Sequence, residues 1–431
     1  MSHRMRRMLV GIAALAAVSL GLTACGSSGP GTSTAKGTIW VITDAGLNPV
    51  VQKSIDSFNK NSATKFSLAN FANDPYKQKL QTAIGSPNQP DIFYNWGGGN
   101  LKQYVDANQV ADLSSALSSD PALKAKFLPS VLAVGTINGK VYGLPMQGVQ
   151  PVMMYANKTV LEKAGIGSMA TDWPGLLSDV AKLKAAGVTP IALAGSQSWT
   201  ELMWLEYLLD RNGGPDKFKA IASGKAGAWS DPAVIKSLTM IQQLVTAGAF
   251  GTNYSAVGYD NKGTQALIAG GKAGYELMGS WEVGALNSSF ADFIKSDTLE
   301  WSAFPKVPGG AGDSSDIAGN PSNYFSVTAK SPNKAAAIKY LTSTLTSSTY
   351  TSALLANGQV PAIAGLGAKV KTGQFADFNS FTYSLVQNSA SFTQSWDQAI
   401  DAATAATMLT NLQKIFLKQI TPQQFAAAMG D

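Results

Sequence analysis

The side chains that most often carry enzyme chemistry are almost missing from this chain of 431 residues. Its single histidine is His3 and its single cysteine is Cys25, so neither imidazole nor thiol occurs beyond Cys25. That composition excludes a Ser-His-Asp triad, a Cys-His pair and the usual His/Cys zinc sites from the body of the chain. Carboxylates, lysines, tyrosines and hydroxyls remain as groups that could bind or react.

Three of the nine tryptophans stand beside turns and next to polar residues, which is the mixture that sugar binding requires. A pyranose ring offers an apolar face that stacks on an indole and a rim of hydroxyls that bonds to carboxylates and amides. The candidate pairs are Trp96 with Asp44, Trp199 with Glu201, and Trp281 with Glu282. The alternative for each indole is an ordinary place in the core or on the surface.

Two further patterns suggest ligand sites but lack the spacing that such sites need. Gly97-Gly98-Gly99 has neither the GxGxxG nor the GxxxxGK[ST] pattern, so a turn or a close backbone approach is expected there. Asp313 and Asp316 lack the Asp-x-Asp-x-Asp-Gly calcium loop with its distal glutamate. Neither a metal ion nor a cofactor is therefore expected.

The N-terminal segment has the order of a secretory signal. Arg4, Arg6 and Arg7 precede an apolar run from Met8 to Leu20, which is shorter than the roughly 20 residues of a membrane-spanning helix. Leu22-Thr23-Ala24-Cys25 closes the run and resembles the lipobox of bacterial lipoproteins. Residues 1–24 are thus expected to be a signal peptide and Cys25 to carry lipid. The alternative is a plain secreted protein with one free thiol.

Residues 25–36 read as a lipidated tether, because their glycines, serines and threonines have little to bury. The formal charge of +6 falls to +3 once the three arginines of the signal are removed, since 33 − 3 − 27 = 3. Lysines are spread along the body as solvated surface, so nucleic acid is not an expected partner. The length allows two domains or one large one, and 45% hydrophobic residues support a real core.

Strands and helices alternate at the start of the body, which predicts a βαβαβ unit with a parallel sheet. Ligands of such sheets bind beyond the carboxyl ends of the strands, and these ends are Asp44, Asn73 and Trp96. Helices are expected to begin at Asn48-Pro49, where Asn48 is the predicted cap, and at Asp74-Pro75. The three predicted strands are 38–43, 66–71 and 91–94.

The remaining pattern continues this α/β alternation. Asn138-Gly139 predicts a hairpin, and Trp40, Trp204 and Trp301 fall in apolar segments expected to be core. Further strands are predicted at 151–157, 189–194, 273–278, 301–304 and 320–328. Further helices are predicted at 172–186, 199–211, 231–248 and 332–350, and the C-terminal third is mostly helical. No linker divides the body, so two lobes would need strands that cross between them more than once.

These features together resemble the family 1 extracellular solute-binding proteins of bacterial carbohydrate ABC importers. Besides the lipobox, three stretches carry the resemblance: Pro90–Tyr94 before Trp96, Gly143-Leu144-Pro145 before Tyr155 and Asn157, and Gly279-Ser280-Trp281. Later, Lys334–Tyr340 and Gly358–Pro361 match the family's closing helix and loop. One departure is Ala156, because the family often has two adjacent tyrosines before Asn157; a structural role for Tyr155 is therefore favoured.

The resemblance implies a two-lobed, periplasmic-binding-protein-like α/β fold with hinge crossings, closing on a sugar. The first lobe would comprise 37–148 and part of 320–431, and the second 149–319 and part of 320–431. Matching positions put Asp44, Asn73, Asp74 and Trp96 on the first lobe and Gln147 near a crossover. They put Trp199, Glu201, Trp281 and Glu282 on the second lobe, with Asn320 at the return crossing.

The expected function is that of a monomeric, lipid-anchored receptor on the outer face of the membrane. It would bind a di- or short oligosaccharide, deliver it to the permease subunits of an ABC importer and catalyse no reaction. One rival is a secreted glycosidase, whose two carboxylates would be Glu201 and Glu282. A second rival is an adhesin without saturable small-ligand binding. The sequence does not distinguish xylo-, malto- or galacto-oligosaccharides.

Overall fold

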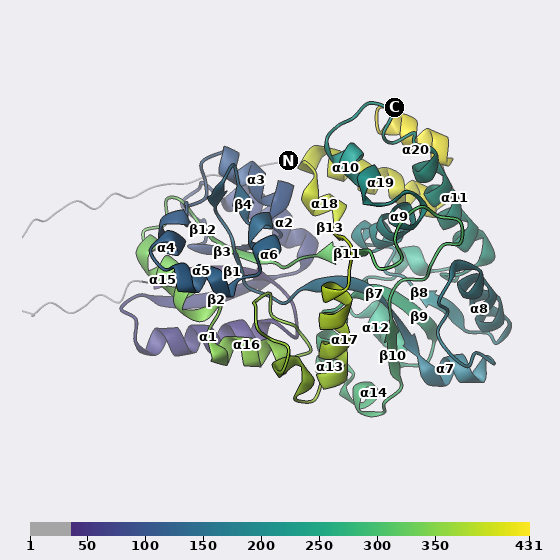
Figure 1. The fold of residues 1–431 in the computed structure, drawn as a ribbon, viewed down its shortest axis with the longest axis horizontal. Coiled ribbons are helices and arrows are strands. Elements are labelled where there is room, and N and C mark those ends of the chain that lie inside the picture. Colours follow the sequence, from purple (N-terminus) through teal and green to yellow (C-terminus); the bar gives the residue numbers. More distant parts are fainter. Residues whose placement is uncertain (1–35) are drawn as a thin grey trace, which may run out of the picture. The chain divides into compact units, whose positions relative to one another are not determined.

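The computed structural model describes residues 36–431, and these contain two large sheets, each with its own hydrophobic core (Figure 1). The expected signal peptide, Cys25 and most of the expected tether lie outside the described residues. Lys36, assigned to the tether from the sequence, is instead the first residue of strand β1. None of the helices described is both long and apolar enough to cross a membrane.

The first lobe is defined here as the five-stranded sheet with order β2-β1-β3-β12-β6 and the helices around it. Strand β1 pairs in parallel with both β2 and β3, which confirms the predicted βαβαβ unit. Strand β12 then joins antiparallel to β3. The strands of this sheet are β1 (Lys36–Ile42), β2 (Lys65–Phe71), β3 (Ile92–Asn95), β6 (Leu144–Pro145) and β12 (Tyr324–Val327).

Helices of the first lobe pack their apolar faces on this sheet. The predicted Asn138-Gly139 turn forms the β4–β5 hairpin, and both turn residues have positive φ. The hairpin strands are β4 (Thr136–Ile137) and β5 (Lys140–Val141). The helices are α1 (Asn48–Lys60), α2 (Asn73–Ala83), α3 (Gly98–Asp106), α4 (Ser114–Ser118), α5 (Pro121–Lys126), α6 (Pro129–Val134), α15 (Lys334–Thr344) and α16 (Ser348–Leu355).

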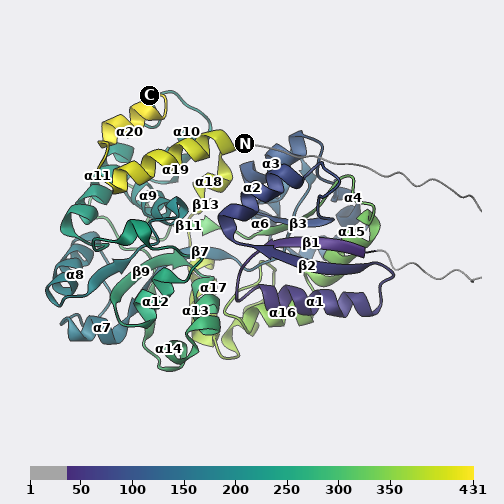
Figure 2. The ribbon, with the colours of Figure 1, turned by 180° about the vertical axis from the view of Figure 1, so that it is seen from behind.

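The second lobe is defined as the six-stranded sheet with order β13-β11-β7-β9-β8, on which β10 also pairs with β7, and its helices (Figure 2). All eight residues of β7 are buried, as expected for the central strand of a covered sheet. The strands are β7 (Gln150–Asn157), β8 (Thr189–Ala192), β9 (Ala273–Gly279), β10 (Leu299–Ser302), β11 (Ile317–Asn320) and β13 (Phe392–Gln394).

Helix α9 is buried along nearly all its length in the second core, and Trp204 packs there at 1% exposure as predicted. Trp40 and Trp301 are only partly buried, against the first and second cores respectively. The helices of the second lobe are α7 (Lys158–Lys163), α8 (Trp173–Ala185), α9 (Ser198–Gly213), α10 (Pro215–Ala222), α11 (Pro232–Ala247), α12 (Gly263–Ala269), α13 (Glu282–Ser289), α14 (Ala291–Lys295), α17 (Ala376–Gln387), α18 (Trp396–Ala399), α19 (Ala402–Phe416) and α20 (Pro422–Ala428), with short 3₁₀ turns at Tyr254–Ala256 and Lys369–Lys371.

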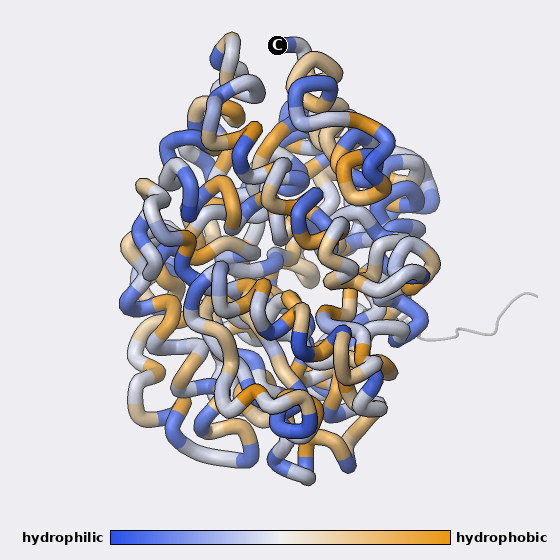
Figure 3. The backbone as a smooth tube through the Cα atoms, turned by 90° about the vertical axis from the view of Figure 1, so that its right-hand side faces the viewer, coloured by the Kyte–Doolittle hydropathy of each residue, from blue (hydrophilic) through white to orange (hydrophobic). Residues whose placement is uncertain are grey.

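Three segments connect the two lobes. Residues 146–149 lead from β6 to β7, residues 321–323 lead from β11 to β12, and residues 356–375 lead from α16 to α17. Hydrophobic and hydrophilic stretches alternate along the chain in both lobes (Figure 3), as expected where each lobe has its own core. The lobe boundaries expected from the sequence stay a prediction.

Three local predictions were wrong. The single strand predicted at 320–328 is divided between β11 and β12, because Pro321 lacks a backbone donor and the chain crosses between sheets there. The single helix predicted at 332–350 is two helices, since the Ser347 side chain caps a new helix by accepting from the Tyr350 N–H. Asn48 does not cap α1; its Oδ1 accepts instead from the Asp44 N–H at 3.2 Å.

Candidate functional site

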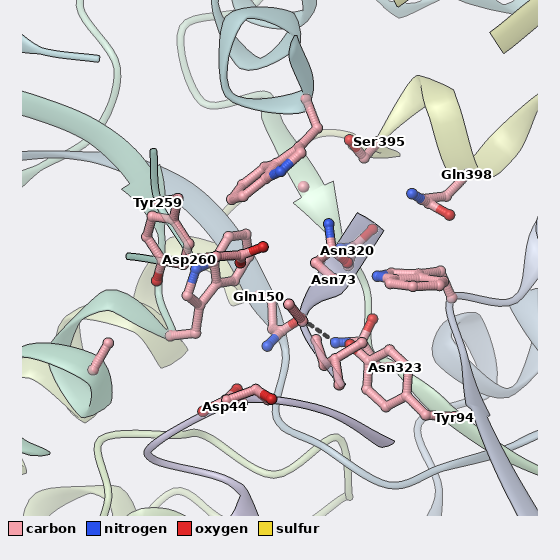
Figure 4. Close-up of a pocket in the computed structure, with 18 of the residues that line it drawn as sticks. Asp44, Asn73, Tyr94, Gln150, Tyr259, Asp260, Asn320, Asn323, Ser395 and Gln398 are labelled. Atoms are coloured by element: carbon pink, nitrogen blue, oxygen red, sulfur yellow. Dashed lines mark hydrogen bonds between the residues drawn. The ribbon is translucent and has the colours of Figure 1, made fainter. Parts of the chain in front are cut away.

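A cavity of about 1240 Å³, counting the part open to solvent, is lined by residues from both lobes and from the crossings. Asp44, Asn73 and Trp96 follow the carboxyl ends of β1, β2 and β3 and line the cavity, as the sheet rule predicts. Figure 4 shows the labelled side chains arranged around this common space.

The three tryptophans singled out from the sequence all line this cavity. The ring centroids of Trp199 and Trp281 are 6.3 Å apart with 50° between their planes. Trp199 also meets Tyr259 edge-on at 5.3 Å. Trp96 comes from the first lobe and lies edge-on to Tyr94 at 5.0 Å. The cavity therefore presents aromatic surface from both lobes.

Gly279 explains the orientation of Trp281. A Cβ added at this last residue of β9 would overlap the six-membered ring of the Trp281 indole, so the ring lies directly against the glycine. Any larger side chain would displace the indole. The Gly279-Ser280-Trp281 motif thus has a packing reason, and Ser280 anchors the turn by donating to the Val149 carbonyl at 3.1 Å.

Six of the ten residues predicted for the site line the cavity, and four do not. Those lining it are Asp44, Asn73, Trp96, Trp199, Trp281 and Asn320. Asp74 points back at its neighbour and accepts from Asn73 Nδ2 at 3.3 Å. Gln147 lies behind the cavity wall and donates to Asp44 Oδ2 at 3.0 Å. Direct binding of ligand by any of the ten stays a prediction.

The other two, Glu201 and Glu282, are fully buried away from the cavity. Burial raises the pKa of Glu201 to about 8, and neither of its carboxylate oxygens has a hydrogen-bond partner among residues 36–431. Glu282 Oε2 accepts from Tyr259 Oη at 2.8 Å and from Gln265 Nε2 at 3.2 Å. Burial raises the pKa of Glu282, those two donors lower it, and the charge of Asp44 raises it further. These two glutamates do not flank the cavity as a glycosidase pair would.

Asp44 is the carboxylate best placed to meet a ligand from the first lobe. Its Oδ1 accepts from the N–H groups of Gly46 and Leu47, both at 2.9 Å, and its Oδ2 accepts from Gln147. Burial raises the pKa of Asp44, and these donors oppose that effect. The backbone donors fix the carboxylate at the edge of the cavity, where sugar hydroxyls could donate to it.

A chain of buried amides connects Asp44 to the two nearby crossings. Asn323 Nδ2 donates to Gln147 Oε1 at 2.8 Å and to Gln150 Oε1 at 2.5 Å, the latter drawn in Figure 4. Each of these three amides is at most 3% exposed. Because Gln147 and Asn323 lie on different crossings, the network ties the cavity wall to the hinge.

Sequence reasoning missed several lining residues from both lobes. They are Lys77, Tyr94, Gln150, Tyr259, Asp260, Asn323, Ser395, Asp397 and Gln398. Two of them had a detectable signal: Lys77 is four residues after Asn73 on α2, and Tyr94, on β3, is two residues before Trp96.

The charged groups that line the cavity are mostly paired with the protein. Lys77 Nζ is 3.4 Å from Asp397 Oδ2 and 5.0 Å from the centroid of the Trp96 ring. Asp260 Oδ2 accepts from Gln197 Nε2 at 3.0 Å. Burial raises the pKa of Asp260, and the charge of Asp74 adds to this. Among residues 36–431, no three acidic, histidine or cysteine side chains gather as a metal-binding group.

Several polar atoms of residues that line the cavity are themselves buried in the protein. Within the described part of the chain, no hydrogen-bond partner is found for Trp199 Nε1, Asn320 Oδ1, Asn323 Oδ1 or Gln398 Oε1. Buried polar groups without partners are costly, so a rearrangement that gives these atoms partners would be favourable. Aromatic faces beside unpartnered donors and acceptors suit a sugar ring.

Comparison with known proteins agrees with this architecture. The sequence profile described as bacterial extracellular solute-binding protein matches residues 41–348. A probable sugar-binding periplasmic protein of Mesorhizobium japonicum is 27% identical over 300 residues, which are 68% of this chain and 67% of that protein. The chain spans about half the length of the first curated relatives that it matches, at 46% and 52%.

Two solved structures have the same fold. One, from work on xylan utilization by Caldanaerobius polysaccharolyticus, is 26% identical with a TM-score of 0.81 and covers 91% of this chain and 98% of its own. The other is a chitin oligosaccharide binding protein, 23% identical with a TM-score of 0.81, covering 92% of this chain and 97% of its own. These similarities confirm the two-lobed α/β fold expected from the sequence.

Proposed function

Because the chain belongs to the bacterial extracellular solute-binding protein family, we propose that it captures a di- or short oligosaccharide and delivers it to the permease of an ABC importer. The observation that carries the proposal is the meeting of Trp96, Trp199 and Trp281 in one cavity between the lobes. The relatives named as sugar-binding and chitin oligosaccharide binding proteins support the same class of ligand.

The division of the site between two lobes accounts for capture without chemistry. A sugar held by Trp96 and Asp44 on one side and by Trp199 and Trp281 on the other contacts all of them only when the lobes are close. Such a ligand binds the closed state more tightly and shifts the population toward it. Release then requires only reopening, and no bond of the sugar is broken.

The anchor expected from the sequence completes the proposal. Lipid on Cys25 would hold a monomeric receptor at the outer face of the membrane, after cleavage of residues 1–24. The short linker that follows would let the body reach the permease. Radiolabelled palmitate incorporated by the producing cell, and lost in Cys25→Ser, tests this part separately.

Isothermal titration calorimetry with xylo-, malto-, galacto- and chito-oligosaccharides of two to five units tests the function. We expect saturable binding of at least one series, with a dissociation constant in the micromolar range or tighter. A micromolar constant corresponds to a standard free energy of binding of about −8 kcal/mol. Trp281→Ala should abolish this heat while the far-ultraviolet circular dichroism stays unchanged. Binding equal to wild type in Trp281→Ala would contradict the proposed site.

Trp301→Ala is the matched control, since Trp301 is also partly buried in the second lobe but packs edge-on against Phe378, 5.2 Å away, outside the cavity lining. This variant should bind as wild type does. The same oligosaccharides, incubated with the protein and separated by chromatography, should be recovered intact. Released monosaccharide would support a glycosidase instead.

A further inference from the structure

The three consecutive glycines at 97–99 lie where the lobes meet. They form the start of α3 in the first lobe, and α18 of the second lobe lies beside α3 and contacts it (Figures 1 and 2). Trp96, which lines the cavity, immediately precedes them. The glycines therefore stand between the cavity and the contact of the two lobes.

Gly99 is required by space and not by backbone conformation. It is not among the glycines with positive φ, so an alanine could adopt its backbone angles. A Cβ at this position would nevertheless lie 2.7 Å from the Ala399 carbonyl oxygen and closer still to that of Ile400. Ordinary van der Waals contact requires at least 3.4 Å between the added Cβ and the Ala399 carbonyl oxygen, so the second-lobe backbone would have to move away from position 99.

The segment that approaches Gly99 also builds the cavity wall beside Trp96. Ser395, Asp397 and Gln398 line the cavity. Immediately beside them, Gln394 Nε2 donates to the Trp96 carbonyl at 2.7 Å, across the two lobes. Lys77 pairs with Asp397 across the same boundary. The separation at Gly99 thus sets the distance between Trp96 and the polar groups that face it.

We propose that Gly99 is a positioning residue of the binding site, which sets ligand affinity by letting residues 394–400 close against Trp96 without touching the ligand itself. The inference rests on the proposed function, in which a sugar bridges the lobes. On this proposal, opening of the lobes moves Ile400 and Ala399 away from position 99, so that a methyl group there obstructs the closed arrangement. Affinity should then fall while the stability of the ligand-free protein does not.

The test compares Gly99→Ala with wild type by calorimetry, thermal unfolding and small-angle X-ray scattering, using the oligosaccharide that wild type binds best. We expect affinity at least about tenfold weaker. The radius of gyration should decrease on sugar addition in wild type and much less in Gly99→Ala. The ligand-free melting temperature should match that of wild type. Gly167→Ala is the control, because a Cβ there meets nothing within 4 Å and its φ is not positive.

Wild-type affinity in Gly99→Ala would overturn the inference and leave the proposed function standing. The inference would also be overturned if Gly99→Ala without sugar melted at a lower temperature than wild type, by an amount that accounts for the lost affinity. Gly99 would then have only a structural role. If wild type binds none of the sugars, the proposed function fails and this inference fails with it. Gln394→Met removes the hydrogen bond to the Trp96 carbonyl and leaves Gly99 in place, so it tests the contact between the lobes without a replacement at position 99. It should weaken binding about threefold or more.

Discussion

Glu201 should make the protein less stable as the pH rises, and its replacement by glutamine should remove that dependence. The carboxyl group is 0% exposed, and no partner for its two oxygens is found within residues 36–431. Burial raises the pKa of Glu201 from 4.5 to about 8. Burial also raises the pKa of Tyr254, and the charge of Glu201 raises it further. The folded protein therefore holds a proton that the unfolded chain releases above pH 4.5.

The sign follows from proton binding. Between pH 4.5 and 8 the native state binds more protons at this site than the unfolded state, so the free energy of unfolding falls as the pH rises. The loss amounts to about 1.4 kcal/mol per pH unit and about 2.5 kcal/mol between pH 5 and pH 7. Other buried acids such as Glu206 contribute in the same direction, so only the difference between two variants isolates Glu201.

The assay is urea unfolding at 25 °C, followed by circular dichroism at pH 5, 6 and 7, for wild type and Glu201→Gln. The stability of the variant relative to wild type should increase by about 2.5 kcal/mol from pH 5 to pH 7. Glu162→Gln is the matched control, because Glu162 is exposed on α7 and the same replacement there leaves the buried acids in place. A difference between Glu201→Gln and wild type that is constant over this range would refute the reasoning.

Three other predictions concern the site. Gly279→Ala should displace the Trp281 indole and weaken sugar binding at least about tenfold, as measured by calorimetry; unchanged affinity would mean that the ring is not held by this contact. Asp44→Asn should weaken sugar binding and flatten the dependence of affinity on pH. Burial raises the pKa of Asp44, so wild-type affinity should fall on acidification as this carboxylate takes up a proton. Identical pH profiles of affinity in the variant and wild type would remove Asp44 from the site. Gln147→Leu should lower the free energy of unfolding by about 1–3 kcal/mol, because it removes the hydrogen bonds of Gln147 to Asp44 and Asn323. In a double-mutant cycle with Asn323→Leu, measured by urea unfolding, the two losses should be non-additive. Additive losses would show that the two amides act separately.

The sequence predicted the part of the site that depends on a regular sheet. Parallel strands bring their carboxyl ends to one edge, so Asp44, Asn73 and Trp96 could be grouped without coordinates. Adjacent turns and polar neighbours singled out Trp199 and Trp281, the resemblance assigned them to the second lobe, and both line the cavity.

The glutamates beside two tryptophans do not line the cavity, because residues close together at a helix point in different directions. Glu201 follows Trp199 by two residues on α9, about 200° around a helix of 3.6 residues per turn. It therefore faces away from the cavity. Glu282 follows Trp281 at the start of α13 and is turned toward Tyr259 and Gln265 instead.

The loops and crossings could not be predicted from local patterns. Tyr259 and Ser395 lie in different segments far apart in the chain, and only the return of the chain at residues 321–323 and 356–375 brings the corresponding parts together. The same applies to the contact of Gly99 with Ile400, which joins residues of opposite lobes. Such long-range placement depends on the packing of both cores and has no periodic signal.

The most direct test is fluorine NMR of protein labelled with 5-fluorotryptophan, whose nine resonances are assigned by single replacement. On titration with the best oligosaccharide, the resonances of Trp96, Trp199 and Trp281 should shift and saturate together, while that of Trp204 in the second core stays in place. A sugar that binds with measurable heat but leaves those three indoles unshifted would contradict the account.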